Sequence, residues 1–253
     1  MGKSNGVRVS FMVALVALIA LVSAPTAMAQ LTVGQTAPPG DASPPCVFTN
    51  PYDEFQTGVA AGNSYTVPAA GLLTSWSTNA GSTPGQTLGF KVFRPVAGSY
   101  LVVAQDQMRP LVSGALNTFP IAIPVLAGDL IGVYQPGGTT ANCSFETAFA
   151  ADTVVFKMGN VPPGGTVVPT ETGSPEPESR LNVSATLLPP PTITSITPAK
   201  GSVVGGGKVV ITGANFALVS GVSFGATPAR SFTVDSETQI TAIAPKSSKL
   251  VKV

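Results

Sequence analysis

The chain contains no histidine, and this absence excludes more chemistry than any other feature of its composition. Ser-His-Asp triads, Cys-His nucleophile pairs and histidine-ligated zinc or iron sites all need an imidazole. Charged residues are scarce, at 10% of 253, against a usual ~25%. Gly and Pro number 27 and 24. The composition predicts a turn-rich, weakly charged protein of roughly one to two domains, outside the familiar hydrolase and metalloenzyme classes.

The first 29 residues carry the only long apolar run of the sequence. Lys3 and Arg8 precede an unbroken apolar stretch, Phe11–Val22, and the tripeptide Ala27-Met28-Ala29 has the small-x-small pattern of a cleavage site. This order predicts a secretory signal peptide that is removed before Gln30. A membrane anchor is the alternative, but the stretch is shorter than the ~17 to 25 residues that span a bilayer. We therefore expect a secreted or cell-surface protein with no membrane span in its mature chain.

Cysteine is limited to Cys46 and Cys143. In a reducing compartment they would be two buried thiols, whereas in an oxidising one a pair most simply forms a disulfide. Such a bridge would close a loop of nearly a hundred residues, worth about 4 to 5 kcal/mol in the chain-entropy treatment. Two cysteines without histidine cannot close a zinc site. We predict a disulfide, no metal site and no cofactor.

The region from residue 46 to residue 188 has the pattern of a β domain. Residues 30–45 (QLTVGQTAPPGDASPP) are polar and proline-rich, which predicts a flexible leader. Short runs rich in Val, Ile, Phe, Tyr and Thr then alternate with turn residues, and no segment keeps a helical period. The runs are LLTSWST, TLGFKVFRP, SYLVVAQ, NTFPIAIPV, DLIGVYQ, DTVVFKM and RLNVSATLL. They predict an antiparallel sandwich or jelly roll.

The sequence also predicts the burial of one strand and the course of one long loop in this domain. In GFKVF, Phe90 and Val92 lie on one side and Lys91 and Phe93 on the other, which predicts one face more buried than the other. The Pro- and Gly-rich interval 159–179 is predicted to be a long surface loop within the domain, because RLNVSATLL still needs a strand partner.

Pro189–Pro191 marks the predicted boundary between two domains, because three consecutive prolines form a stiff spacer. The charge changes sign there. Residues 46–188 hold five basic and nine acidic side chains, a net charge of −4, and residues 189–253 hold six basic and two acidic ones, a net charge of +4. Opposite charges could attract the two halves, although surface ion pairs are worth only ~0 to 1 kcal/mol each.

The C-terminal region, residues 192–253, also has a strand pattern. The segments ITSITP, KVVITG, VSFG, SFTVD and QITAIAP are predicted strands. Gly205–Gly207 gives the backbone freedom for a tight reversal. Asn215 tolerates a positive φ, and Phe216 is predicted to enter the core.

This segment order resembles the IPT/TIG domain, an immunoglobulin-like fold, over 63 residues from Pro191. The resemblance rests on an I-x-P motif, a G-G-x-V-x-I-x-G-x-N-F signature, a V-x-F-G motif and an I-x-A-x-A-P motif. They lie at Ile196–Pro198, Gly206–Phe216, Val222–Gly225 and Ile240–Pro245. The family continues through two more strands, so the resemblance implies a partial sandwich with an exposed apolar seam, poor stability and a truncated product. The N-terminal region resembles, less specifically, an uncharacterised jelly-roll-like domain of exported bacterial proteins.

Candidate site residues carry no catalytic signature. Trp76, the only tryptophan, is either a sugar-stacking platform or a core residue, and its place in a strand favours the core. We expect half-buried framework positions for Tyr52, Tyr100 and Tyr134.

A glycosidase pair or a calcium site would need carboxylates at a recognisable spacing. The carboxylates of this region, Asp53, Glu54, Asp106, Asp129, Glu146 and Asp152, have no such spacing. Gly205–Lys208 lacks the G-x-x-x-x-G-K-[ST] order of a phosphate loop, and the sequons at Asn142 and Asn182 matter only in a glycosylating host.

The sequence as a whole predicts an exported, non-catalytic surface or extracellular binding or adhesion protein, with the IPT/TIG-like region as a spacer or contact module. We expect its partner to be a surface polymer, a glycan or a protein. The alternative is an accessory, non-catalytic region of an exported polysaccharide-degrading enzyme. Nucleic acid is not an expected partner, because the basic residues are scattered and the signal peptide directs the chain out of the cell.

Overall fold

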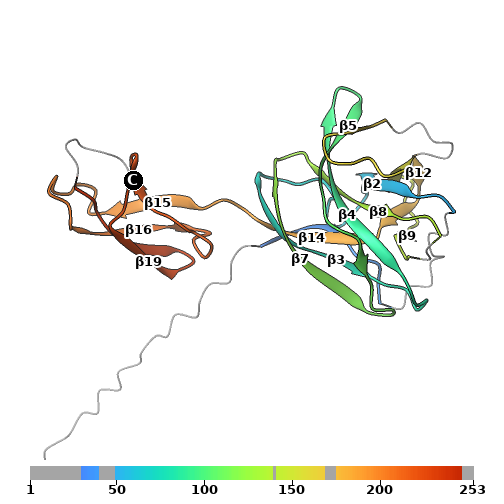
Figure 1. Cartoon of the computed structure of the whole chain (residues 1–253), viewed down its shortest axis with the longest axis horizontal. Coiled ribbons are helices and arrows are strands. Elements are labelled where there is room, and N and C mark those ends of the chain that lie inside the picture. The colour runs from blue at the N-terminus through green and yellow to red at the C-terminus, as the bar shows by residue number, and fades with distance from the viewer. Residues whose placement is uncertain (1–29, 40–48, 139–140, 169–174, 247–253) are drawn as a thin grey trace, which may run out of the picture.

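The computed structural model describes residues 30–39, 49–138, 141–168 and 175–246, shown in colour in Figure 1. These residues form antiparallel strands and turns, which confirms the predicted all-β fold class. An N-terminal sandwich is followed by a smaller C-terminal unit, with the segment between β14 and β15 as their connection (Figure 1). Within the described residues there is no helix able to cross a membrane.

Two main sheets form the sandwich. The first has four strands in the order β1 (Leu31–Gln35), β14 (Val183–Leu188), β3 (Gly71–Asn79) and β7 (Leu116–Val125). The second runs β11 (Thr166–Val167), β5 (Ser99–Gln105), β4 (Thr87–Val96), β8 (Leu130–Gln135), β2 (Tyr52–Gly58), β10 (Thr153–Met158) and β12 (Glu176–Pro177), and β6 (Arg109–Pro110) pairs with β4. A short ladder joins β9 (Ser144–Glu146) to β13 (Ser179–Leu181).

The larger sheet is covered on both faces. On its inner face, Phe90 and Val92 pack in the core between the sheets. On its outer face, Phe93 lies in a cluster against which Val161 packs. Val161 belongs to a segment that we call the strap, residues 159–168, whose end forms β11 at the edge of the same sheet. The prediction of one less buried face was therefore wrong, because Lys91 and Phe93 are as fully buried as their neighbours. The described part of the predicted surface loop 159–179 includes this covering layer.

The predicted flexible leader contains a strand. Residues Leu31–Gln35 pair in register with Val183–Leu187 of β14, and Val33 and Ala37 are buried. The segment is too polar to form an element by itself, but the edge of β14 supplies backbone partners about 150 positions further along the chain. Residues 40–45, the rest of the predicted leader, lie outside the described residues.

The predicted strand over residues 180–188 is interrupted at Asn182. This fully buried side chain accepts hydrogen bonds from the backbone N–H groups of Ala37 and Asn79, and its amide donates to the carbonyls of Asn79 and Asn142. Since these bonds hold the side chain in the interior, the chain is divided into β13, which pairs with β9, and β14, which pairs with β1 and β3.

The C-terminal unit has one four-stranded sheet in the order β15 (Thr192–Thr197), β16 (Lys208–Ala214), β20 (Gln239–Ile243) and β19 (Ser231–Ser236). A hairpin of β17 (Ser223–Phe224) and β18 (Thr227–Pro228) forms a second, two-stranded sheet. Asn215 has a φ of 62°, Gly205 and Gly206 have φ of 75° and 81°, and Phe216 is buried. The predicted strands, turns and core aromatic of this unit are confirmed.

Candidate functional site

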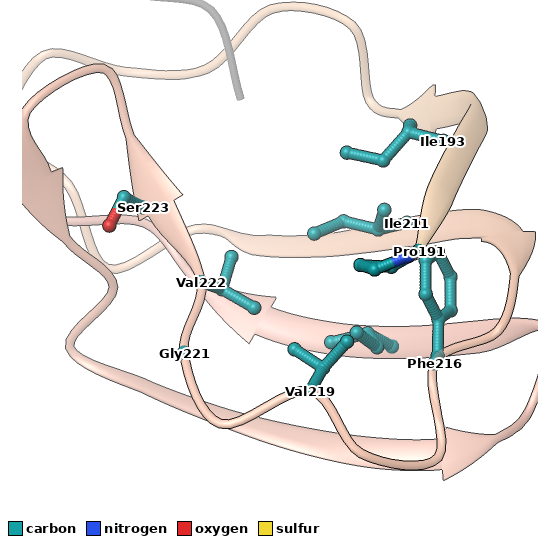
Figure 2. A pocket seen from close by; sticks show the side chains of 9 residues that line it. Pro191, Ile193, Ile211, Phe216, Val219, Gly221, Val222 and Ser223 are labelled. Carbon is teal, nitrogen blue, oxygen red and sulfur yellow. The ribbon is translucent and has the colours of Figure 1, made fainter. Parts of the chain in front are cut away.

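An open apolar groove of about 160 Å³ lies in the C-terminal unit. Its most deeply buried residues are Ile211 on β16, Phe216 in the loop after β16, and Ile240 on β20. Ile193 stands on the rim with 50% of its surface exposed. Figure 2 shows Ile193 and Ile211 on one side of this space and Val222 on the other. The groove is therefore a gap between the sheet and the segment that leads into β17.

The loop after β16 forms the second wall of the groove. Its course is set by the positive φ of Asn215, by the hydrogen bond from Phe216 N–H to the Glu237 carbonyl, and by the bond from Val219 N–H to the Phe216 carbonyl. Val219 and Val222 then face the sheet and are only half-buried. Apart from Ser223, the side chains of this lining are apolar, so the groove favours contact with apolar side chains.

The sandwich presents a second candidate surface, which we call the loop end: residues 81–86 and 111–117. Two buried amide side chains hold it. Asn117 accepts from Val112 N–H and donates to the Val112 and Ala115 carbonyls, and Gln86 donates to the carbonyls of Gly81 and Thr83. The hydrogen bond from Gly114 N–H to the Gly81 carbonyl joins the two segments.

Two apolar side chains project from the loop end. Val112 and Leu116 are 68% and 61% exposed. Because hydrogen bonds from buried amides set the backbone beneath them, these side chains are presented in a defined geometry, as contact loops on a rigid scaffold commonly are. This surface has no local signal in the sequence, because neither valine nor leucine marks a binding site and the side-chain hydrogen bonds of Gln86 and Asn117 are visible only in the folded chain.

The predicted carboxylate candidates lie in separate ion pairs instead of a shared cleft. Asp53 pairs with Lys91, Asp106 with Arg109, Asp129 with Arg94 and Asp152 with Arg180. The pKa values of Asp53 and Asp152 are shifted in opposite directions. Burial raises the pKa of Asp53 despite the hydrogen bond from Lys91. Burial also acts to raise the pKa of Asp152, but hydrogen bonds from Arg180, Ala60 N–H and Thr147 hold that pKa below its usual value.

The Asp53–Lys91 pair fastens the strap to the sheet. Both side chains are fully buried, and the Lys91 ammonium also donates to Asn160 Oδ1 at 2.7 Å and to the Val161 carbonyl at 2.8 Å. Asp53 Oδ2 accepts from Val161 N–H at 2.9 Å. Burial lowers the pKa of Lys91, and the hydrogen bond from its ammonium to Asp53 opposes this change. The geometry is that of a structural ion pair whose donors and acceptors are used within the fold.

Glu54 points to the opposite side of β2 from Asp53 and is buried. Burial raises the pKa of its carboxyl from 4.5 to about 8, with smaller contributions from the charges of Glu176 and Asp53. Its Oε2 lies 3.3 Å from Cys143 Sγ, and within the described residues its Oε1 has no hydrogen-bond partner. Near neutral pH this side chain is mostly an uncharged acid. Glu146, by contrast, is exposed on β9.

Trp76 is a core residue with 0% of its surface exposed. Its ring packs against Phe90 and Phe119, with centroids 5.7 and 4.8 Å away, and its indole N–H donates to Asp106 Oδ2 at 2.9 Å. The ring is therefore inaccessible as a sugar-stacking platform. The half-buried positions expected for the three tyrosines are confirmed: Tyr52 lies against Phe156, Tyr100 against Phe55, and Tyr134 beneath the Lys91 ammonium.

The remaining sequence candidates are placed only in part. Cys143 is fully buried, but Cys46 lies outside the described residues, so the disulfide stays a prediction. Ala29 is also outside them, and Gln30 is the first residue described, one position before β1. Both sequon asparagines, Asn142 and Asn182, are buried. Among the described residues there is no cluster of three or more Cys, Asp or Glu side chains that could hold a metal ion.

Comparison with known proteins identifies one part of the chain. The family model of the IPT/TIG domain matches residues 191–253, in agreement with the resemblance in the motifs of this region. This domain is an immunoglobulin-like, non-catalytic module that often occurs in extracellular proteins. No curated protein and no solved structure matches the chain.

Proposed function

We propose that this protein is an exported, non-catalytic surface or extracellular binding protein that acts in adhesion. The sandwich contacts the partner through its loop end, and the IPT/TIG domain is a spacer or additional contact module. The observation that carries the proposal is the loop end itself. Val112 and Leu116 are exposed on backbone held by the buried amides of Gln86 and Asn117. Such preorganisation reduces the entropy lost on binding.

The partner that best fits this surface is a protein. Glycan sites commonly offer an exposed aromatic ring, but the ring of Trp76 is inaccessible, and the loop end presents aliphatic side chains. The ion pairs of the sandwich support a non-catalytic role, because Asp53, Asp129 and Asp152 are each held by a basic partner in the fold. Export is supported by the predicted signal peptide and by the position of β1, which begins one residue after Gln30.

The test uses the mature chain, residues 30–253, labelled and applied to an array of extracellular proteins, a glycan array and isolated peptidoglycan. We expect retention on at least one protein, and loss of about tenfold or more of that retention in V112S/L116S, because apolar contacts of about 1 to 3 kcal/mol each are removed. The matched control is Leu126→Ser. Leu126 is 52% exposed and follows the other end of β7.

The outcomes separate clearly. Retention that is lost in V112S/L116S and kept in Leu126→Ser supports the proposal. No retention on any of the three surfaces overturns it, as does equal loss in both variants. Retention on glycans or peptidoglycan alone would contradict the choice of a protein partner.

A further inference from the structure

The outer face of the larger sheet brings an amine, a carboxyl group and a primary amide together beneath the strap. Lys91 on β4 and Asp53 on β2 are fully buried and in contact. The Lys91 ammonium also lies 2.7 Å from Oδ1 of Asn160, a strap residue 69 positions further along the chain. A nucleophile, an acyl carbon and a proton carrier, the three groups that an exchange of amides needs, are therefore in one place.

The strand between the two buried residues leaves room for this contact. β8 lies between β4 and β2 in the sheet, and its residue opposite Lys91 is Gly132. Because glycine has no side chain, Lys91 passes over β8 and reaches Asp53. A Cβ at Gly132 would lie 2.8 Å from a ring carbon of Phe93, so a larger residue at this position would crowd the outer face.

The side-chain carbonyl carbon of Asn160 lies within reach of the amine. A C=O bond is about 1.2 Å long, so Asn160 Cγ lies no more than about 4 Å from Lys91 Nζ. The Val161 carbonyl, which accepts from Lys91 at 2.8 Å, holds the ammonium beside the asparagine. The usual competitor for this carbon is the next backbone nitrogen, but Val161 N–H donates to Asp53 Oδ2 at 2.9 Å. The fold therefore holds Lys91 as the nucleophile at this carbon.

Burial favours the proton transfer that the reaction requires. An ammonium group has no lone pair, so the amine must lose a proton before it attacks. Burial raises the pKa of Asp53 and lowers the pKa of Lys91, although the hydrogen bond between them opposes both changes. A carboxylic acid beside a neutral amine is therefore more accessible here than in water. Asn160 is itself exposed on the strap, so released ammonia has a direct path to solvent.

We propose that Lys91 and Asn160 form an intramolecular isopeptide bond, with Asp53 as the catalytic proton carrier. Asp53 takes a proton from the Lys91 ammonium, and the Nζ lone pair attacks Asn160 Cγ to form the Nζ–Cγ bond. The bond from Cγ to Nδ2 breaks, Asp53 gives its proton to Nδ2 and takes a second one from Nζ, and ammonia leaves. Asp53 ends as the uncharged acid, so no unpaired carboxylate remains buried.

The ion pair of Lys91 and Asp53 is the form of this site before the reaction. The new bond joins β4 to the strap, so the strap cannot detach from the sheet without breaking a covalent bond. The reaction consumes no oxidant and no cofactor. The bond involves neither the loop end nor the groove, so it can be tested without a binding partner.

The first experiment measures the mass of the protein and locates the change. Residues 30–253, folded and then reduced and denatured, should weigh about 17 Da less than the sequence requires, because one ammonia is lost. Cyclisation of an N-terminal Gln30 would also release ammonia, so a trypsin digest decides the location. Trypsin should fail to cleave after Lys91, and the peptide of residues 158–180 should stay joined to the peptide that contains Lys91.

The second experiment removes the acyl carbon. Asn160→Ala should abolish the joined peptide and restore about 17 Da, and it should fold, because Asn160 is exposed. The matched control is Asn63→Ala, a change to another exposed asparagine of the sandwich, which should keep the joined peptide. Asn160→Ala retains the ion pair of Lys91 and Asp53, so it is also the background in which the contribution of that pair to stability is measured.

The third experiment follows the reaction from the unfolded chain. Protein recovered from inclusion bodies in urea should give separate peptides, because the fold has not brought Lys91 and Asn160 together, and the joined peptide should accumulate after refolding. Asp53→Asn should slow this accumulation by about a hundredfold or more, because the proton carrier is lost. Near-ultraviolet circular dichroism identifies the folded fraction of this variant, to which the rate refers.

Three results would overturn the proposal. In the first, the folded wild type gives a peptide that ends at Lys91 and a separate peptide of residues 158–180. In the second, the joined peptide persists in Asn160→Ala. In the third, Asn160 gains about 1 Da by deamidation and no joined peptide forms, which would show that water or the backbone, and not Lys91, attacks this carbon. A wild-type rate in folded Asp53→Asn would remove Asp53 from the reaction.

Discussion

The sandwich and the C-terminal unit differ in how far other strands and segments cover the two faces of their largest sheets. In the sandwich, the four-stranded sheet covers the inner face of the larger sheet, and the strap packs over Asp53 and Lys91 on its outer face. In the C-terminal unit, the two-residue strands of one hairpin face a four-stranded sheet. The difference shows in the aromatic residues, since Phe93 is fully buried and Phe232 is half-buried.

Because both faces of the larger sheet are covered, the sandwich contains buried ionisable side chains in this sheet. Because the strap excludes water from the outer face, Lys91 and Asp53 are buried there as a pair. On the inner face Glu54 is buried, and this burial raises its pKa. In the C-terminal unit the ionisable residue Asp235 lies on the surface, where hydrogen bonds from Thr241 and Gln239 lower its pKa. The doubly covered sheet of the sandwich therefore contains buried ionisable side chains, whereas Asp235 in the C-terminal unit remains exposed to solvent.

The largest expected effect is a pH dependence confined to the sandwich. The unfolded chain releases the Glu54 proton near pH 4.5 and the folded chain near pH 8. The folded state binds the proton more tightly, so the free energy of unfolding should fall as pH rises from about 4.5 to about 8, by up to about 5 kcal/mol. Glu54→Gln should flatten this slope.

Urea unfolding at pH 5, 6.5 and 8 measures the slope for each unit. The matched control is Glu146→Gln, a change to an exposed carboxylate on β9, which should leave the wild-type slope intact. Parallel slopes for the wild type and Glu54→Gln would show that Glu54 is not the group responsible.

The second effect concerns the strap. Lys91→Met leaves the Asp53 carboxylate buried without its cation and should cost about 3 to 5 kcal/mol. It should also expose residues 159–168 to proteolysis, because the ammonium bonds to Asn160 and Val161 are lost. The double variant D53L/K91M should recover most of the stability. Arg109→Met is the control, since both side chains of the Arg109–Asp106 pair keep contact with solvent, at 24% and 11% exposed, and it should cost about 1 kcal/mol or less. Equal losses for Lys91→Met and Arg109→Met would contradict the structural role of the buried pair.

Hydrophobic periodicity and turn residues predicted most of the strands. They did not identify a strand whose polar side chains are buried against residues far away in the sequence. The runs around Trp76, Phe90 and Val133 combine apolar residues with flanking turns, and all three are strands. The segment YDEFQTG was not identified, although it forms β2, in the middle of the larger sheet. Its Asp53 and Glu54 look like solvent-facing residues until Lys91, 38 positions later, and the covering strap are in place.

The C-terminal unit was more predictable because its signals are local. Asn215 and Gly205 have the positive φ expected from their residue types, and Phe216 follows directly into the core. The contact surfaces were less accessible to prediction. The loop end depends on Gln86 and Asn117, polar residues whose burial requires neighbouring loops, and the groove depends on which strands oppose the sheet.

The third effect compares truncations of equivalent aromatic residues. Phe93→Ala removes a fully buried ring from the strap side of the sandwich and should cost about 3 to 5 kcal/mol. Phe232→Ala removes a half-buried ring in the C-terminal unit and should cost about 1 to 2 kcal/mol. Calorimetry that resolves the melting transition of each unit gives both values. A cost for Phe232→Ala as large as that for Phe93→Ala would mean that the open face is as well packed as the closed one.

The smallest expected effect distinguishes backbone geometry from a surface hydrogen bond in the C-terminal unit. Asn215 has a φ of 62°, and its side-chain amide donates to the Pro190 carbonyl at 3.1 Å in an exposed position. Asn215→Ala should cost about 1 to 2 kcal/mol, because Cβ opposes this conformation. Asn215→Gly keeps the conformation and loses only the exposed bond, so it should change stability by less than about 0.5 kcal/mol. The melting temperature of the C-terminal unit measures both changes. If Asn215→Gly destabilised the unit as much as Asn215→Ala, the bond to the proline spacer, and not the turn, would be the reason that this position needs asparagine.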